Sequence, residues 1–243
     1  MKKFLTAEWR DLIMANYEVD PALLASRVPH GTELDLQDGR CFVSLVGFMF
    51  LNTRVLGIPI PYHVNFEEVN LRFYVKRDTG TELRRGVVFV KEIVPRRAIT
   101  FVARTLFGEP YETAIMRSFN DPGKVCYRFR TVPNIHTTKF KNIMRERIKV
   151  TRGDRLGIPA EGSHEEFIIE HYWGYTKRGS TSTDEYKVEH PKWELYATRH
   201  PKIEVKFWQW YGKEFKFLRD AEPYSILLAK GSPISVYFGE RLR

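Results

Sequence analysis

The 243-residue chain is predicted to form a mainly β protein of the α+β class, an antiparallel sheet or barrel with a few packed helices. Aromatic residues are abundant, with 17 Phe, 12 Tyr and 5 Trp, and such residues favour strands. Apolar, β-branched runs are bounded by short turns that contain glycine, proline or asparagine, which is typical of consecutive strands. No repeat, low-complexity tract or linker divides the chain, so residues 1–243 are expected to form one domain.

In the first half of the chain, two helices and three strands are predicted. Asp20-Pro21 supplies an N-cap and a proline at the first helical position, which predicts a short helix over 22–28. Residues 95–107 carry apolar side chains at helical spacing and are followed by Gly108, which predicts a second helix. Strands are predicted over 40–50, 63–76 and 85–94.

In the second half, strands dominate again. Ser163 and Glu166 form a capping-box pattern, which predicts a helical turn or two over 164–171. A further helix is predicted over 207–218. Strands are predicted over 111–118, 124–132, 140–150, 172–176, 185–197, 224–228 and 234–238, the first two forming a hairpin.

Composition excludes several classes of protein. The chain contains no run of about 18 apolar residues, so no membrane span is expected. Charged residues interrupt any signal-like segment near the N-terminus, and a cytoplasmic location is therefore expected. Cys41 and Cys126 lie in apolar, strand-like runs, which predicts buried free thiols.

The net charge of +9 raises the question of a polyanionic partner. Residues 139–155 contain seven basic residues against two acidic ones. This segment is either a binding face for nucleic acid or another polyanion, or a strand whose basic side chains are solvated while Ile148 and Val150 pack inside. No nucleic-acid motif accompanies it, so a nucleic-acid partner is not expected.

The segment 103–114 carries the most informative motif. An Arg104-containing helical run passes through Gly108 and Pro110 into an extended segment. The segment resembles the signature of the acetoacetate decarboxylase superfamily, in which two adjacent lysines follow the proline and the first forms a Schiff base with the substrate ketone. Counting from Arg104, the lysine pair falls on Tyr111 and Glu112, so the resemblance implies that the amine is missing there.

Two further segments fit the same superfamily in order and spacing. Arg10 precedes Asp20-Pro21 by the interval at which the family places an arginine that faces the pocket. Residues 66–72 resemble the strand that supplies the pocket glutamate, with Glu68 as the best match. Residues 170–175 and 188–193 resemble the uncharacterised YqjF-like branch. The resemblance covers nearly the whole chain and implies an acetoacetate decarboxylase-like fold.

The resemblance implies a pocket between Arg10, Glu68 and Tyr111 for a small carboxylated or carbonyl compound. A guanidinium binds a carboxylate bidentately, a buried glutamate exchanges protons, and a phenol donates a hydrogen bond to an oxyanion. Without the lysine, acetoacetate decarboxylation is not expected. No residue is assigned as catalytic, and the sequence leaves turnover open.

Each of these residues also has a structural alternative. Arg10 can pair with Glu8 or Asp11, Glu68 can form an ion pair with Arg72, and Tyr111 can be a core tyrosine. Glu112 is expected to be solvated, and Arg104 to anchor the helix on the sheet. Lys91, on a neighbouring strand, is the alternative amine.

Cofactors and partners are predicted mostly by exclusion. His171 and His190, even with His63 or His136, match no zinc spacing, so neither a metal nor another cofactor is expected. The expected partner is a small-molecule carboxylate or carbonyl compound. The alternative function is a non-catalytic module that binds a polyanion through its basic face. The oligomeric state stays open, with a homo-oligomer among the alternatives.

Overall fold

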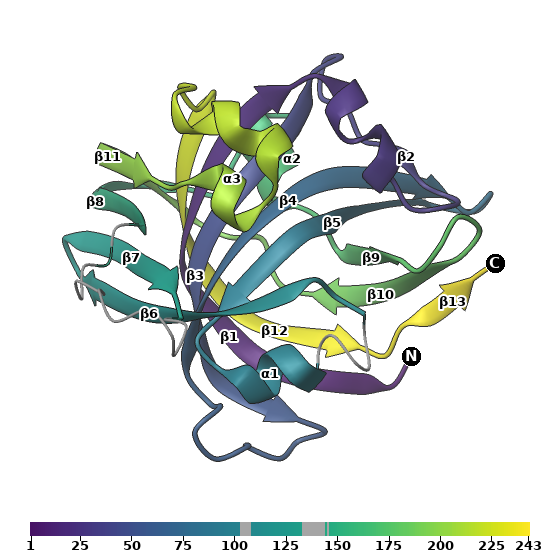
Figure 1. The fold of residues 1–243 in the computed structure, drawn as a ribbon, viewed down its shortest axis with the longest axis horizontal. Coiled ribbons are helices and arrows are strands. Elements are labelled where there is room, and N and C mark those ends of the chain that lie inside the picture. The colour runs from purple at the N-terminus through teal and green to yellow at the C-terminus, as the bar shows by residue number, and fades with distance from the viewer. Residues whose placement is uncertain (103–107, 133–143, 145) are drawn as a thin grey trace.

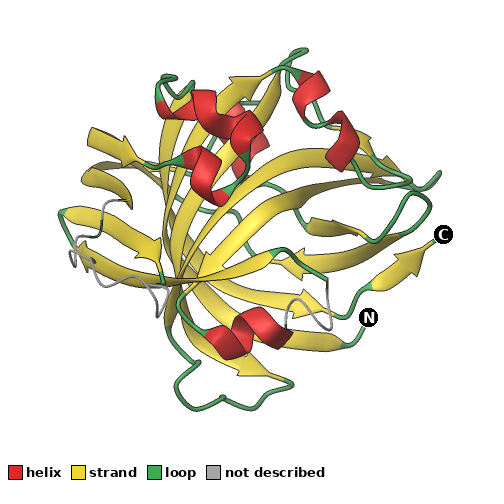
Figure 2. Ribbon diagram, viewed as in Figure 1, coloured by secondary structure: helices red, strands yellow, loops and turns green. Residues whose placement is uncertain are grey.

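Strands make up most of the computed structural model, which describes residues 1–102, 108–132, 144 and 146–243 (Figure 2). The predicted mainly β class is confirmed. The strands are β1 (Lys3–Val19), β2 (Glu33–Leu34), β3 (Cys41–Val55), β4 (Phe66–Asp78), β5 (Leu83–Val94), β6 (Tyr111–Asp121), β7 (Lys124–Thr131), β8 (Glu146–Gly157), β9 (Trp173–Lys177), β10 (Thr183–Glu189), β11 (Leu195–Glu204), β12 (Ser225–Tyr237) and β13 (Glu240–Leu242). The helical elements are η1 (Pro21–Leu23), η2 (Ala25–Arg27), α1 (Arg97–Val102), α2 (His164–Ile169), α3 (Phe207–Trp210) and η4 (Lys213–Arg219).

The strand pairings close two rings that share β12, β1, β3, β4 and β5 (Figure 1). One ring continues through β6, β7, β8 and β11, and the other continues through β9 and β10. The rings fork at β5, which pairs with β6 at Glu92–Val94 and with β9 at Gly86–Val87. They rejoin at β12, which pairs with β11 and with β10 at different points. All thirteen strands of the described residues thus belong to one sheet. The continuity of the sheet does not test the number of domains, so the prediction of one domain stays a prediction.

The shared strands form a wall between two hydrophobic cores. The first core contains Val43, Leu71, Phe73, Tyr127 and Ile148 among its members. The second core contains Phe42, Phe48, Tyr74, Ile168 and Trp193. Successive side chains of a strand point to opposite faces, so β4 sends alternate residues into each core. The polar residues of β4 that alternate with Leu71 and Phe73 therefore face the second core.

The N-terminal strand β1 was not predicted from sequence. It has 17 residues and pairs with β3 on one edge and with β12 on the other. Glu8, Arg10 and Asp11 interrupt its apolar alternation, which hides the strand pattern. The structure accommodates them with a register shift between Arg10 and Ile13 and a positive φ of 55° at Asp11.

Several predicted element boundaries were wrong in the second half of the chain. The strand predicted over 185–197 is divided into β10 and β11, because Pro191 between them has no backbone N–H for a ladder. The helix predicted over 207–218 is divided into α3 and η4 at Gly212, whose φ is 118°. The two strands predicted from 224 to 238 form one continuous strand, β12.

The remaining helical predictions hold in shorter form. The helix predicted over 22–28 is the pair of 3-10 turns η1 and η2, with the Asp20 side chain accepting a hydrogen bond from the Ala22 N–H. The capping box is confirmed, since the Ser163 side chain accepts from the Glu166 N–H at the start of α2. The helix predicted over 95–107 is observed as α1, and 103–107 lies outside the described residues. Likewise, 140–143 and 145 of the strand predicted over 140–150 lie outside them.

Two predictions from composition can be compared with the structure. Cys41 and Cys126 are buried free thiols, as predicted. In the part of the chain that the structure describes, no helix has the length and apolar character that a bilayer crossing requires.

Replacement of Gly231 by alanine is expected to destabilise the protein by about 2 kcal/mol or more. Gly231 lies in β12 with a φ of 74°, and a Cβ built there would be 1.9 Å from the carbonyl oxygen of Trp9. The new methyl group would therefore push β12 away from β1 in the shared wall. Urea denaturation monitored by tryptophan fluorescence measures the change.

Gly57→Ala is the matched control. Gly57 has a φ of 83°, but a Cβ there meets no atom within 4 Å. This variant tests the backbone conformation alone and is expected to cost about 1 kcal/mol. Equal losses in the two variants would contradict the close approach of β12 and β1.

Candidate functional site

Three neighbouring strands bring a row of polar side chains into the second core. Asn70 of β4 pairs directly with Glu92 of β5, and Glu92 is in register with Tyr111 at the start of β6. Glu68 lies two residues before Asn70 and so shares its face. Because paired residues on adjacent strands point to the same side of a sheet, these four side chains lie together.

Hydrogen bonds connect the members of this row. Asn70 Nδ2 donates to Glu68 Oε1 at 2.9 Å, and the Tyr111 hydroxyl donates to Glu68 Oε2 at 3.3 Å. The Tyr111 hydroxyl also interacts with Glu92. Glu68 and Glu92 are only 2% and 3% exposed. The phenol of Tyr111 therefore sits between two buried carboxyl groups.

A third buried carboxyl group, Glu109, joins the row from the segment that precedes β6. It accepts a hydrogen bond from the Thr176 hydroxyl of β9 and interacts with the Tyr186 hydroxyl of β10. Its charge also acts on Glu68 and on Glu92. The acidic cluster is defined here as the following five residues: Glu68, Glu92, Glu109, Tyr111 and Tyr186.

Gly174 of β9 makes room for Tyr186 in the acidic cluster. The two residues are directly paired between β9 and β10. A Cβ built at Gly174 would lie 2.1 Å from Cζ of the Tyr186 ring, which no side chain tolerates. The absence of a side chain at Gly174 therefore lets the phenol lie across β9 and reach Glu109.

The acidic cluster holds protons at neutral pH. Burial raises the pKa of Glu68 to about 7, although the hydrogen bonds from Asn70 and Tyr111 oppose this change. Burial likewise raises the pKa of Glu109 to about 7. Burial and the charges of the other two carboxyl groups raise the pKa of Glu92 well above its usual value. Burial also raises the pKa of the Tyr111 phenol, so its hydroxyl stays a neutral donor.

Arg72 is a buried cation on the same face of β4. Its side chain donates from Nη2 to the carbonyl oxygen of Ile168 at 3.2 Å and lies 5.6 Å from the ring centre of Tyr74. The sequence left open an ion pair with Glu68, but the two side chains form none within 4.0 Å. Glu68 instead binds Asn70 and Tyr111.

Three buried polar atoms near the cluster have no hydrogen-bond partner among the described residues: Asn70 Oδ1, Arg72 Nε and Glu92 Oε2. They come from one face of two paired strands. Buried polar atoms in proteins are nearly always satisfied by protein, water or a ligand. This group of atoms therefore provides polar donors and acceptors that the described residues leave unused.

The structure brings Glu68 and Tyr111 together but does not bring Arg10 to them. Both Nε and Nη2 of Arg10 bond to Glu8, and Nη1 donates to the carbonyl oxygen of Gly231 at 3.1 Å. Arg10 of β1 pairs with Met49 of β3, and Met49 pairs in turn with Glu67 of β4. Glu68 pairs instead with Phe48, so its side chain lies on the other face of the sheet. Arg10 is thus on the face opposite to Glu68. It forms the ion pair with Glu8 that the sequence left open as an alternative to a pocket role. Its binding role stays a prediction.

The neighbouring charged residues lie on the other face of the sheet. Lys91 of β5 donates to Glu112 of β6 at 2.6 Å, and both side chains are partly exposed. Since Lys91 is adjacent to Glu92 in the strand, it points away from the acidic cluster. Arg104, predicted to anchor the helix, lies outside the described residues.

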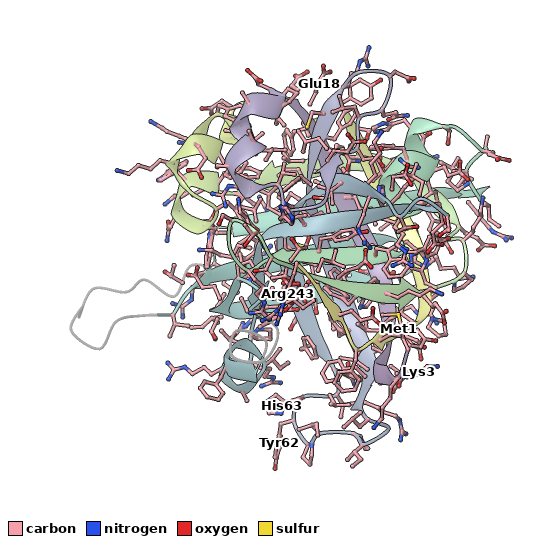
Figure 3. The ribbon with its side chains drawn as sticks, turned by 90° about the vertical axis from the view of Figure 1, so that its right-hand side faces the viewer. Met1, Lys3, Glu18, Tyr62, His63 and Arg243 are labelled. Carbon is pink, nitrogen blue, oxygen red and sulfur yellow. The ribbon has the colours of Figure 1, made fainter. Side chains whose placement is uncertain are left out.

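Four histidines were considered as metal ligands, and the three that the structure describes belong to no group of three or more potential metal-ligating side chains. His171 lies 3.7 Å from Asp35, and His190 stacks between Tyr172 and Trp193. His63 contacts the carbonyl oxygen of Pro61 at the far end of the molecule from Glu18 (Figure 3). His136 lies outside the described residues.

Sequence reasoning missed three members of the acidic cluster: Glu92, Glu109 and Tyr186. It also did not predict that Arg72 lies apart from Glu68. Glu92 had a weak signal, because Lys91 and Glu92 are charged residues in the otherwise apolar end of the strand. Glu109, between a glycine and a proline, resembles any turn residue and had none. Tyr186 enters the cluster only through its pairing with Gly174, which no local pattern contains.

Replacement of Glu68 by glutamine is expected to stabilise the protein at pH 8 and to have less effect at pH 5. The folded carboxyl group keeps its proton up to about pH 7, whereas the unfolded one loses it near 4.5. The contribution of Glu68 to stability therefore falls as the pH rises from about 4.5 to 7, and glutamine removes this loss. The gain at pH 8 is on the order of 1 kcal/mol or more, and urea denaturation at the two pH values measures it.

The control for this variant is Glu67→Gln. Glu67 precedes Glu68 in β4, faces the opposite side and accepts a hydrogen bond from Ser118 at 3.0 Å. Its replacement is expected to show no gain between the two pH values. A gain of the same size in both variants would contradict the assignment of the proton to Glu68.

Comparison with solved structures identifies the fold. The chain is similar over its whole length to an acetoacetate decarboxylase from Legionella pneumophila, with a TM-score of 0.65, 12% identity and coverage of 88% of that chain. The enduracididine biosynthesis enzyme MppR complexed with pyruvate matches with a TM-score of 0.64 and 11% identity, covering 100% of this chain and 91% of that one. An acetoacetate decarboxylase-like enzyme from Sphingomonas wittichii has a TM-score of 0.63 and 12% identity, with coverage of 100% and 94%. The predicted acetoacetate decarboxylase-like fold is confirmed.

Comparison of sequences identifies the family. The "Uncharacterized protein YqjF" of Bacillus subtilis is 33% identical over 120 residues, which are 49% of this chain. The match spans 48% of YqjF, about half the length of that relative. Residues 6–233 match the family DUF2071, described as "Uncharacterized conserved protein". The predicted YqjF-like relationship is confirmed, and the chain belongs to the DUF2071 family.

Proposed function

We propose that this protein binds a small carbonyl or carboxylated compound at the acidic cluster, through hydrogen bonds and proton exchange. The observation that carries the proposal is the Tyr111 hydroxyl held between Glu68 and Glu92 inside the second core. Three strands hold these groups in place before any ligand arrives, as binding sites in rigid scaffolds require. MppR has a similar fold and was solved in complex with pyruvate, which supports a ligand about as small as pyruvate for this protein.

The chemistry of the cluster suits an oxygen that gains negative charge. A carbonyl oxygen near Tyr111 would accept a hydrogen bond from its neutral phenol. Glu68, with a pKa of about 7, can give or take a proton at neutral pH. If turnover occurs, Glu68 is the acid or base and Tyr111 is the donor to the developing oxyanion.

An imine at this place is not part of the proposal. Tyr111 carries no amine, and the described contacts of the acidic cluster include no lysine. Lys91, the alternative amine on the neighbouring strand, is engaged by Glu112 on the opposite face. Hydrogen bonding and proton transfer therefore replace covalent chemistry in the proposed site.

The alternative function, polyanion binding by the basic segment 139–155, gains little support from the charges that the structure describes. Three of its arginines form ion pairs: Arg147 with Glu204, Arg152 with Asp11 and Arg155 with Glu194. Such pairs leave less positive charge for a polyanion. Of the other four bases, Lys149 lies in β8 opposite Lys202 of β11, and those at 139, 141 and 145 lie outside the described residues. This function therefore stays a prediction.

The Tyr111→Phe variant is expected to bind pyruvate roughly fivefold more weakly than the wild type, because one hydrogen bond to the carbonyl oxygen is lost. Isothermal titration at pH 7 measures both affinities. Tyr237→Phe is the matched control, since Tyr237 also donates to a carboxylate, Glu189, but lies outside the acidic cluster. Its affinity for pyruvate is expected to equal that of the wild type.

Two outcomes would contradict the proposal. Equal loss of affinity in the two tyrosine variants would separate binding from the acidic cluster. Borohydride trapping of a stable adduct with acetoacetate would show an imine at a lysine instead. A polyanionic ligand would reveal itself differently, by an affinity that falls steeply between about 50 and 200 mM salt.

A further inference from the structure

We infer that the Arg72 guanidinium holds the carboxylate group of a small organic anion in the second core. The inference rests on the function proposed above and names the residue that would select charged ligands over neutral ones. Arg10, the arginine that the sequence motif indicates, is not the anchor in this inference.

The contacts of Arg72 hold its guanidinium in place but leave one donor free. The side chain is 9% exposed. Nη2 donates to the carbonyl oxygen of Ile168 and lies 3.9 Å from the sulfur of Met14, while the Tyr74 ring lies beside the guanidinium. Nε is buried and has no hydrogen-bond partner among the described residues. The free N–H is therefore a preorganised donor.

The charge of Arg72 calls for an anion. An arginine side chain stays protonated at any ordinary pH, so burial cannot neutralise it as it does a carboxyl group. Among the described residues, no carboxylate lies within 4.0 Å of it. An unpaired buried charge is unfavourable, and an incoming carboxylate would relieve that cost while it makes a charge-assisted hydrogen bond to Nε.

The position of Arg72 links this donor to the acidic cluster. Arg72 and Asn70 are two residues apart on one face of β4, so their Cα atoms are about 6.6 Å apart. Asn70 pairs directly with Glu92, which is in register with Tyr111. A compound of three to five carbons, bound at Nε through its carboxylate, would extend toward these polar groups. Its carbonyl group would then approach the place that the proposed function requires.

The surroundings favour a carboxylate over a more highly charged anion. The three carboxyl groups of the acidic cluster repel negative charge in proportion to their ionisation. Glu68 and Glu109 have pKa values raised to about 7 by burial, so a monoanion meets partly protonated neighbours at neutral pH. A phosphate dianion would meet about twice the repulsion at the same guanidinium.

Arg10 offers no comparable site. Its described donors bind Glu8 and the carbonyl oxygen of Gly231, and its side chain is 30% exposed. A ligand carboxylate would have to displace an existing ion pair to reach it. Arg10 therefore serves as the matched control for Arg72 in the experiment that follows.

The experiment compares pyruvate with pyruvamide, its neutral amide, by isothermal titration of the full chain at pH 7. The wild type is expected to bind pyruvate at least tenfold more tightly than pyruvamide. Arg72→Gln is expected to lose at least tenfold in affinity for pyruvate and to bind pyruvamide within about twofold of the wild type. Arg10→Gln is expected to bind both compounds as the wild type does, and Arg72→Lys to retain part of the preference for pyruvate.

The possible failures are distinguishable. If the wild type binds neither compound, the proposed function fails and this inference fails with it. If it binds both equally, or if Arg10→Gln alone loses the preference, the binding function stands and the role of Arg72 is overturned. The wild-type preference needs no variant, so it tests the inference even if Arg72→Gln does not fold.

In addition, the Nε–H resonance of Arg72 is expected to shift on addition of pyruvate to the wild type, and an unchanged resonance would contradict the contact.

Discussion

The burial of β4 on both faces is the constraint on which the rest of this structure depends. One face contributes Leu71 and Phe73 to the first core. The other carries Glu68, Asn70 and Arg72 into a second core that contains little water-exposed surface. A strand in this position would ordinarily be apolar throughout, because unpaired polar groups are costly in an interior. The polar row of β4 carries that cost in this structure.

The buried carboxyl groups and the buried guanidinium meet this constraint in opposite ways. The pKa values of Glu68 and Glu109 rise to about 7 with burial, so these groups can become neutral by holding a proton. Arg72 cannot change its charge and must instead find a partner. The result is a site with proton donors on one side and a fixed positive charge on the other. This asymmetry distinguishes the second core from an ordinary hydrophobic interior, and it is the polarity on which the proposed binding of a keto acid rests.

The similarity to acetoacetate decarboxylases concerns the fold, and the site has to be understood from its own residues. Identities of 11–12% to the solved structures leave room for different chemistry on the same framework. Here β6 begins with a phenol at the place where the motif suggested an amine. The Tyr111 hydroxyl bonds to carboxyl groups, and the nearest lysine on the neighbouring strand pairs with Glu112 behind the sheet. At the start of β6 the framework therefore positions a hydrogen-bond donor beside buried acids.

Local sequence patterns were sufficient for the class of fold, most strands, the caps at Asp20 and Ser163, the free cysteines and the family. These features depend on interactions within a few residues, or on motifs that survive in order along the chain. The strand β1 and the contact between Glu68 and Tyr111 had weaker signals. The separation of Arg10 from both was indicated only by the acidic residues Glu8 and Asp11 beside it in the sequence. Long-range pairing decided these features, because a register shift of one residue reverses which face a side chain occupies. The alternation of Glu68 and Asn70 with apolar residues is the same in a solvated strand and in this one, and only the second ring of strands makes their face an interior.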